Sequence, residues 1–227
     1  MASTLRVLNG DTASPTLVLT KPHSTGSPKR LPSIADDFES AKRRLFTVEE
    51  YNRMGTAGIL DEDERVELLD GEIIRMSPIG PRHVSNVNQL TRFFILTFDG
   101  LAIVSTQNPI VTDRTSEPQP DIVLLRQRKD RYSESLPTAA DVLLIVEVSD
   151  TTLHRDRSKK LAIYGRAGVP EYWIVNLLDD TLEVYRVPTA KEYGIKKVLT
   201  RKNSIAALAF PKKKIAVRDL LLPISKN

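Results

Sequence analysis

Cysteine is absent from this 227-residue sequence, and histidine occurs only three times. Disulfide bonds and thiolate metal sites are therefore excluded, and a metal site built on histidine is not expected. Any bound metal would be held by oxygen atoms, which are the ligands that magnesium, manganese and calcium prefer.

Long apolar runs are also missing. No stretch approaches the roughly 20 apolar residues that a membrane span needs, and residues 1–20 lack the basic segment and apolar block of a secretory signal. We therefore expect a soluble, cytoplasmic protein with no membrane partner. With 41% hydrophobic residues, the chain can form one good-sized core.

Basic residues do not dominate the middle of the chain, although its net charge is +4. Residues 1–44 carry seven basic and four acidic side chains, residues 45–190 carry 16 and 23, and residues 191–227 carry ten and two. The net −7 of the central region argues against a broad phosphate-binding face there, whereas the +8 of the last segment could contact phosphate. The alternative for that segment is a solvated edge or tail.

The domain organisation follows from composition. Residues 1–44 mix serine, threonine, proline and charged side chains without periodicity, which predicts a mostly disordered leader. We expect the folded domain at 45–222 and a short tail at 223–227. Thr47 and Glu50 have the spacing of a capping box, which predicts a short helix reaching about residue 54.

Alternating helix and strand patterns fill the central region. Asp70-Gly71 predicts a tight hairpin between residues 65–69 and 72–76. Apolar residues at intervals of three and four predict a helix over 82–98, and a second helix is expected at about 154–167. Further strands are predicted at 101–106, 121–125, 142–148, 171–176 and 181–186. This order indicates an α/β or α+β sheet domain.

Two acidic residues interrupt apolar runs that indicate buried strands. Asp121 precedes one run and Glu147 lies near the end of another. Burying a carboxylate is costly unless it is paired, hydrogen-bonded or bound to a metal, so the two residues suggest a site for a divalent cation. Asp156, Lys160 and Tyr164 follow at intervals of four on the next predicted helix, so the lysine can point back toward Glu147. Metal-bound carboxylates beside a cation suit phosphodiester hydrolysis.

The ordered motifs from about residue 46 to 186 resemble the PD-(D/E)XK nuclease superfamily, and more closely its Uma family of restriction-endonuclease-like proteins. The matching segments are Val66-Glu67-Leu68-Leu69-Asp70-Gly71-Glu72-Ile73-Ile74, Met76-Ser77-Pro78, Pro118-Gln119-Pro120-Asp121, Glu147-Val148-Ser149-Asp150, Asp156-Arg157, Lys160-Leu161, Tyr164 and Gly168-Val169-Pro170-Glu171-Tyr172-Trp173-Ile174-Val175. So long an ordered series is specific, whereas the short superfamily motif alone occurs by chance.

The resemblance implies a restriction-endonuclease-like mixed β-sheet flanked by helices, with Asp121 and Glu147 as metal ligands. The backbone carbonyl of Val148 would complete a site for Mg²⁺, with Mn²⁺ as an alternative. The superfamily motif expects lysine two residues after the glutamate, where this chain has Ser149. The expected substitute is Lys160, which would bring its ammonium group to the same place from the helix.

Several further residues are explained by structural roles, or have one as an alternative. Glu67 is the candidate for an additional acid of the site, and its alternative is a charged residue on an exposed hairpin face. Ser149 is expected to cap or bond backbone, and Tyr164 and Trp173 are expected to pack in the core. His83 is expected to cap a helix or face solvent.

The leading hypothesis is a metal-dependent endodeoxyribonuclease in which Asp121, Glu147 and Lys160 are catalytic, with Glu67 as a tentative fourth member. The alternative is a catalytically weak nuclease fold that binds DNA or protein. DNA is the expected partner, and a homodimer is expected because cutting two strands requires two sites.

Overall fold

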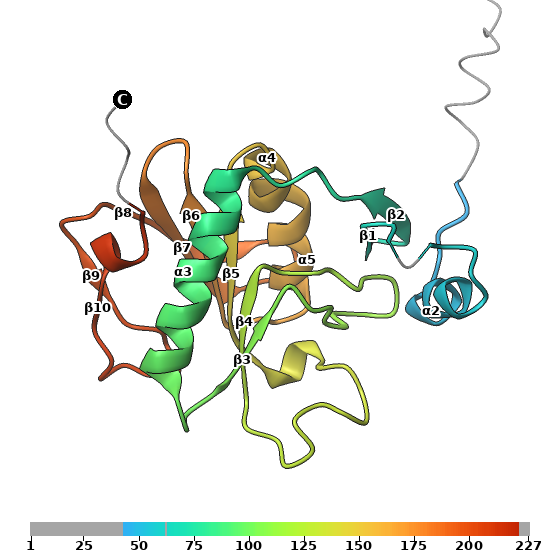
Figure 1. Cartoon of the computed structure of the whole chain (residues 1–227), viewed down its shortest axis with the longest axis horizontal. Helices are drawn as coiled ribbons and strands as arrows, with labels where there is room; N and C mark the ends of the chain where they lie inside the picture. Colours follow the sequence, from blue (N-terminus) through green and yellow to red (C-terminus); the bar gives the residue numbers. More distant parts are fainter. Residues whose placement is uncertain (1–42, 62, 223–227) are drawn as a thin grey trace, which may run out of the picture. The chain divides into compact units, whose positions relative to one another are not determined.

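The structure, a computed structural model, describes residues 43–61 and 63–222. The predicted leader, residues 1–44, lies outside this described part except for its last two residues, and the predicted tail at 223–227 lies wholly outside it. The described residues from Arg44 onward form one compact unit (Figure 1).

A six-stranded mixed sheet, in the order β3-β4-β5-β6-β7-β8, is the centre of this unit. Neighbouring strands are antiparallel except β5 and β6, which are parallel. The strands are β3 (Ile103–Thr106), β4 (Ile122–Leu125), β5 (Val142–Ser149), β6 (Glu171–Asn176), β7 (Thr181–Pro188) and β8 (Tyr193–Leu199). The sequence predicted all of them except β8, where glycine and adjacent lysines break the apolar alternation.

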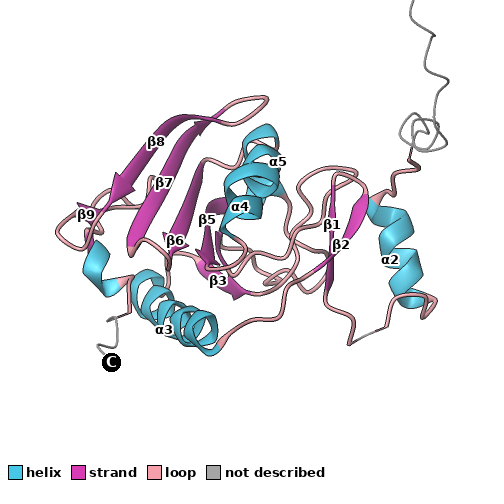
Figure 2. Cartoon of the chain, turned by 90° about the horizontal axis from the view of Figure 1, so that it is seen from above, coloured by secondary structure: helices cyan, strands magenta, loops and turns pink. Residues whose placement is uncertain are grey.

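Helices cover both faces of the sheet, which confirms the predicted fold class (Figure 2). On one face, α3 (Pro81–Phe98) packs its buried leucine and phenylalanine side chains against a core that includes Trp173. On the other face lie α4 (Leu153–Arg155) and α5 (Leu161–Arg166), over a core that includes Tyr172. The alternation of side chains along β6 therefore divides its two large aromatic residues between the layers.

The buried face of α3 differs from the predicted one. Val84 and Ile95 belong to the apolar series at intervals of three and four that predicts this helix and its core-facing side, but they are 38% and 48% exposed. His83 and Asn86 are buried instead, so the expectation that His83 caps the helix or faces solvent is wrong. The first turn of α3 lies over the end of the sheet that carries Asp121, and its inward positions hold polar side chains for that reason.

The helix predicted at 154–167 is present but not uniform. It consists of α4, a π-helical segment η2 (Asp156–Lys160) and α5. A π segment adds one residue to the turn and is frequent at functional sites. The expected stop occurs at Gly168, whose φ of +77° is a conformation that glycine adopts without strain.

A separate two-stranded antiparallel sheet is formed by β1 (Val66–Leu69) and β2 (Glu72–Arg75). Its turn is the predicted Asp70-Gly71, with φ values of +52° and +76°. At position 71 a Cβ atom would lie 2.6 Å from the Cβ of Leu45, so space as well as conformation requires glycine. The hairpin is therefore held tightly, and it carries Glu67.

The remaining elements flank this framework. The helix α2 (Val48–Thr56) begins with the predicted capping box, in which Thr47 Oγ1 accepts from the N–H of Glu50 at 3.2 Å. Beyond the sheet, β9 (Ser204–Ile205) and β10 (Ile215–Ala216) form a short antiparallel pair, and η1 (Ala139–Asp141) and η3 (Val217–Asp219) are single 3₁₀ turns. Within the described ranges, no helix has the length and apolar character needed to cross a membrane.

Candidate active site

Asp121 and Glu147 meet at one end of the central sheet. Asp121 immediately precedes β4, Glu147 is near the end of β5, and these antiparallel neighbours pair Ile122 with Val146. The backbone N–H of Asp121 lies 3.3 Å from Glu147 Oε2, and Asp121 Oδ2 accepts from the N–H of Val148 at 2.9 Å. Only 9% of Asp121 and 3% of Glu147 is exposed, so both carboxylates are buried together.

Lys160 reaches the same pocket from the π-helical segment. Its Nζ atom lies 2.9 Å from Glu147 Oε1 and 3.2 Å from Glu67 Oε2, and the residue is 4% exposed. The lysine thus stands between two carboxylates that come from different sheets. Its charge is compensated on both sides, as a buried ammonium group requires.

Glu67 is part of this cluster, so the alternative that it sits on an exposed hairpin face is wrong. It is 1% exposed, and its Oε2 also accepts from the N–H of Gln119 at 3.2 Å. Its Oε1 has no hydrogen-bond donor in the structure and lies 3.5 Å from a guanidinium nitrogen of Arg155. One buried carboxylate oxygen of the pocket therefore has unused capacity to accept.

Asp156 is a fourth buried acid of the pocket, and no role in a site was predicted for it. Its Oδ2 accepts from the hydroxyl of Ser149 at 2.6 Å and from that of Thr152 at 2.7 Å. Ser149, expected to bond backbone, instead bonds this side chain. Ser149 and Glu147 are two residues apart on β5, so both project to the same face of the sheet.

Tyr164 and His83 hold the two central carboxylates from opposite sides. The hydroxyl of Tyr164 donates to Glu147 Oε1 at 2.9 Å, and Nε2 of His83 lies 3.2 Å from Asp121 Oδ2. Tyr164 is fully buried, which agrees with the packing role expected of it, but it also fixes one rotamer of Glu147. His83 Nδ1 is buried and has no partner in the structure.

The electrostatics of the pocket keep Lys160 charged. Burial alone would lower the pKa of Lys160, but the negative charges of Glu147, Glu67 and Asp156 raise it above the usual value. Lys160 therefore remains an ammonium group across the physiological pH range and cannot accept a proton there.

The pKa values of the two central carboxylates shift in opposite directions. Burial would raise the pKa of Asp121, but the hydrogen bond and charge of His83 hold it below its ordinary value. Burial raises the pKa of Glu147, and Lys160 offsets this effect only in part. Asp121 is accordingly the firmer anion of the pair.

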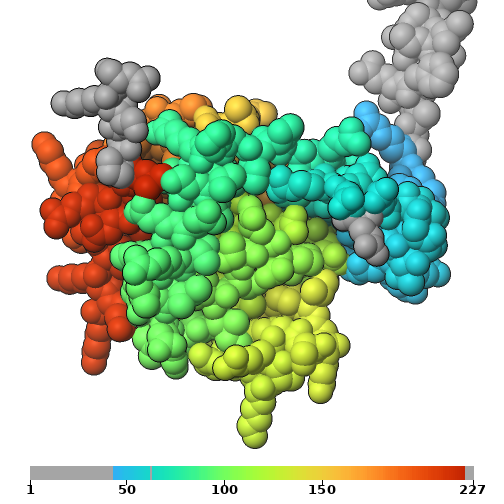
Figure 3. Space-filling model, in the orientation of Figure 1, coloured from blue at the N-terminus to red at the C-terminus, as the bar shows by residue number. Residues whose placement is uncertain are grey.

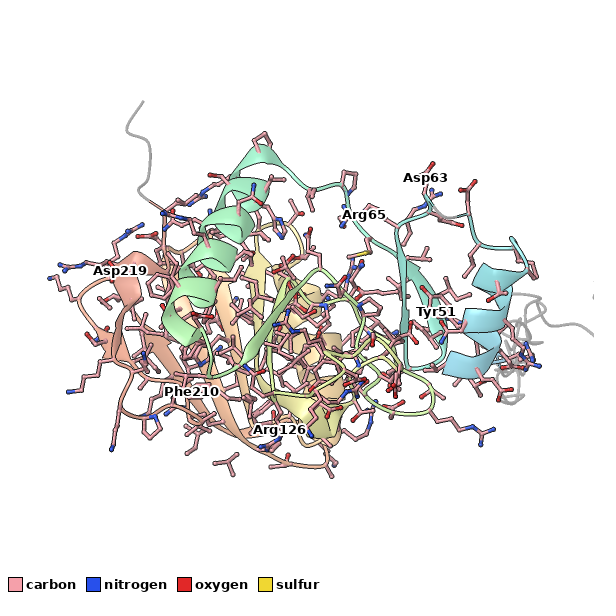
Figure 4. All side chains as sticks on the ribbon, turned by 60° about the horizontal axis from the view of Figure 1, so that its bottom comes forward. Tyr51, Asp63, Arg65, Arg126, Phe210 and Asp219 are labelled. Carbon is pink, nitrogen blue, oxygen red and sulfur yellow. The ribbon has the colours of Figure 1, made fainter. Side chains whose placement is uncertain are left out.

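The pocket is small. Its cavity has a volume of about 40 Å³, and its walls include Met76, Ser77 and Ile79 from the segment between β2 and α3. Arg65, labelled in Figure 4 just before β1, contributes to the same lining. The charged groups are thus held in a site with room for little more than a water molecule.

The carboxylate oxygens of the pocket are ligands of the kind that a hard divalent cation prefers. Asp121 and Glu147 present carboxylate oxygens in one buried pocket, and Glu67 has a buried oxygen that accepts no hydrogen bond. In the described part of the chain, however, no group of three or more such side chains is arranged as a metal site. Lys160 lies between Glu147 and Glu67, which keeps these acids from forming one cluster. Among the described residues, Asp121 and Glu147 therefore remain the candidate pair for holding a cation.

Some residues of this pocket were predicted from the sequence, and others were not. Asp121, Glu147, Lys160 and Glu67 come together in one pocket. His83, Asp156 and Arg155 were missed as members of it. Asp156 carried a signal, because it lies four residues before Lys160, but His83 and Arg155 carried none.

Comparison with known proteins agrees with this architecture. The family described as "Putative restriction endonuclease" (Uma2) matches residues 48–218. The fold is similar to the crystal structure of a putative nuclease belonging to DUF820 from Anabaena variabilis, with a TM-score of 0.59 and 16% sequence identity. That similarity covers 77% of this chain and 97% of the other. Among curated proteins, none matches the chain. The match over most of its length shows that the chain belongs to the Uma2 family of restriction-endonuclease-like proteins.

Proposed function

We propose that this protein is a metal-dependent endonuclease that hydrolyses phosphodiester bonds of DNA. The observation that carries the proposal is the buried contact of Lys160 with Glu147, beside Asp121. A charged lysine next to a carboxylate pair at a sheet end supplies both ligands for a cation and a positive group for an anionic transition state.

Each residue has a distinct part in this proposal. Asp121 and Glu147, with the backbone carbonyl of Val148, would hold Mg²⁺ or Mn²⁺, and Glu67 would add negative charge on the hairpin side. When bound, the metal would polarise the phosphoryl oxygen and lower the pKa of a water molecule. Lys160 retains its proton, so it stabilises charge developing on the phosphoryl oxygens and does not act as a base.

The surrounding residues position this set. Tyr164 fixes Glu147 through its hydroxyl, and His83 and the N–H of Val148 fix Asp121. Such hydrogen bonds orient ligating carboxylates and tune their affinity for a cation. The charged side chains of the pocket are buried, which strengthens each charge interaction among them.

Nicking of supercoiled plasmid tests the proposal. Wild-type protein should nick the plasmid in Mg²⁺ or Mn²⁺ and lose this activity in excess chelator. Asp121→Asn and Glu147→Gln should each lower the rate by at least about 100-fold, whereas Glu134→Gln, a change at an exposed residue, should leave it unchanged. Equal rates with and without chelator, or in wild type and Glu147→Gln, would contradict the proposed metal-dependent nuclease activity.

A second candidate function, DNA or protein binding without hydrolysis, is favoured by one specific observation. Lys160 pairs with both Glu147 and Glu67, inside a cavity of only about 40 Å³. A site that remains in this arrangement would admit no phosphodiester. Retention of DNA by the wild type, with no nicking at any divalent metal concentration, would support this alternative over the first.

A further inference from the structure

Six lysines at the C-terminal edge of the molecule have no acidic partner. All six are exposed, and none makes an ion pair with any described residue. They are Lys191, Lys197, Lys202, Lys212, Lys213 and Lys214. They form what we call the lysine surface, defined by these residues.

Neighbouring basic side chains, unlike those of the lysine surface, form ion pairs with acidic residues. Lys196 Nζ lies 3.0 Å from Glu183 Oε2, and Arg201 Nε lies 2.5 Å from Asp180 Oδ2. Arg218 Nε lies 3.7 Å from Asp219 Oδ1. The acidic groups of Glu183, Asp180 and Asp219 are therefore already paired. Among the described residues, the positive charge of the lysine surface is therefore not compensated by ion pairs.

The lysine surface runs along the β8 edge of the central sheet, from the turn between β7 and β8 to the segments that follow β8. Lys197 belongs to β8, the strand at the edge of the six-stranded sheet, and Lys202 follows that strand. Lys212, Lys213 and Lys214 precede β10. Long side chains project from this red end of the unit in Figure 3, and nitrogen-tipped ones extend near Asp219 in Figure 4.

The chemistry of these side chains suits a polyanion with regularly spaced charges. Lysine presents a point charge on a flexible stem and lacks the fork with which arginine reads base edges. Unpaired lysines on one edge strand and in the neighbouring loops match contacts to successive phosphates, which position a duplex without reading its sequence. The edge strand itself does not favour a second copy, because adjacent Lys196 and Lys197 would oppose pairing with another β8.

We infer that the lysine surface binds the phosphate backbone of duplex DNA, outside the catalytic pocket. The choice of DNA rests on the proposed function, but the binding does not require catalysis. Four strands lie from β5, which carries Glu147, to β8 at this edge, so the surface would contact duplex flanking the scissile bond. It supplies the positive charge that the acidic central region lacks.

Binding of labelled duplex DNA measured against salt concentration tests the inference. In EDTA, which prevents hydrolysis, the full chain is titrated with a duplex of about 30 base pairs over about 50 to 300 mM KCl. Changing Lys212, Lys213 and Lys214 to glutamine should lower the slope of log K against log salt by about two to three units, since each lost phosphate contact removes about 0.9.

A matched variant controls for loss of net charge. Changing Arg114, Lys129 and Arg131 to glutamine removes the same charge at exposed positions elsewhere, and it should keep the wild-type slope. Equal slopes for the two triple variants would overturn the inference. So would lysine-dependent binding that is tighter to duplex RNA or to vesicles of anionic phospholipid than to DNA.

Plasmid nicking by the same variants separates this inference from the proposed function. A wild type that binds through the lysine surface but never nicks contradicts the catalytic proposal alone. A wild type that nicks, with salt slopes unchanged by the lysine substitutions, contradicts the lysine surface alone.

Discussion

Lys160 Nζ lies 2.9 Å from Glu147 Oε1, although the superfamily motif places the corresponding lysine two residues after the glutamate, on the same strand. Here Ser149 occupies that position and points to the same face as Glu147. The π-helical segment brings the ammonium group back from the next helix. Residue order thus differs from the motif while the pairing of lysine and glutamate is kept.

The hydroxyl of Tyr164 should tune the affinity of the site for a divalent cation. Tyr164→Phe removes the donor to Glu147 Oε1, so Mn²⁺ affinity measured by calorimetry should fall about tenfold, as for other groups that orient metal ligands. Tyr193→Phe is the matched control, because Tyr193 donates to the carbonyl of Val169, away from the pocket. It should keep wild-type affinity, and equal affinities in all three proteins would refute the positioning role.

His83 should act by holding Asp121 in place. His83→Leu removes its contact with Asp121 Oδ2, and plasmid nicking should fall by about tenfold to 100-fold. His83→Gln can still donate a hydrogen bond from a similar position, so it should recover most of that loss. His154→Leu changes an exposed histidine and should have no effect. A rate for His83→Leu within about twofold of wild type would contradict this role.

Glu183 should make the fold sensitive to acid. Its hydrogen bonds from Arg157, Tyr185, Lys196 and Asn176 outweigh the effect of burial and lower its pKa from 4.5 to about 2. Because the folded-state pKa is the lower one, the stabilisation is complete above about pH 4.5 and is lost as pH falls toward 2. At about 1.4 kcal/mol per unit, the contribution is about 3 kcal/mol.

Urea unfolding at several pH values measures this contribution. The free energy of unfolding of wild type should fall more steeply than that of Glu183→Gln between pH 4.5 and 2, since the variant has no carboxyl group to titrate. Parallel curves for the two proteins would show that the cluster around Glu183 does not carry the expected linkage.

Local patterns predicted most of the fold because each depends on neighbouring residues. Asp70-Gly71 predicted its hairpin turn, and alternating and helical periodicities predicted five strands and both long helices. The π segment at 156–160 could not be predicted, because a single inserted residue in a helix leaves its apolar pattern almost unchanged. Likewise, β8 has no buried face to produce an apolar alternation.

The candidate site was predictable only where an acid interrupts an apolar run. Asp121 and Glu147 are conspicuous for that reason, whereas Glu67 in the hairpin remained open between two interpretations until its 1% exposure resolved them. His83 joins the pocket through the packing of α3 against the sheet. That contact links residues 38 apart in sequence, and no local pattern encodes it.

If Lys160 supplies the catalytic cation, its loss should abolish most of the activity, which the rate of plasmid nicking by Lys160→Met in Mg²⁺ measures. Fluorescence of Trp173, the single buried tryptophan, reports whether the variant is folded, and Lys160→Gln serves if methionine prevents folding. We expect the folded variant to nick at least about 100-fold more slowly than wild type, while Ser149→Ala stays within about threefold. A folded Lys160 variant that nicks within about threefold of the wild-type rate would contradict this role of Lys160.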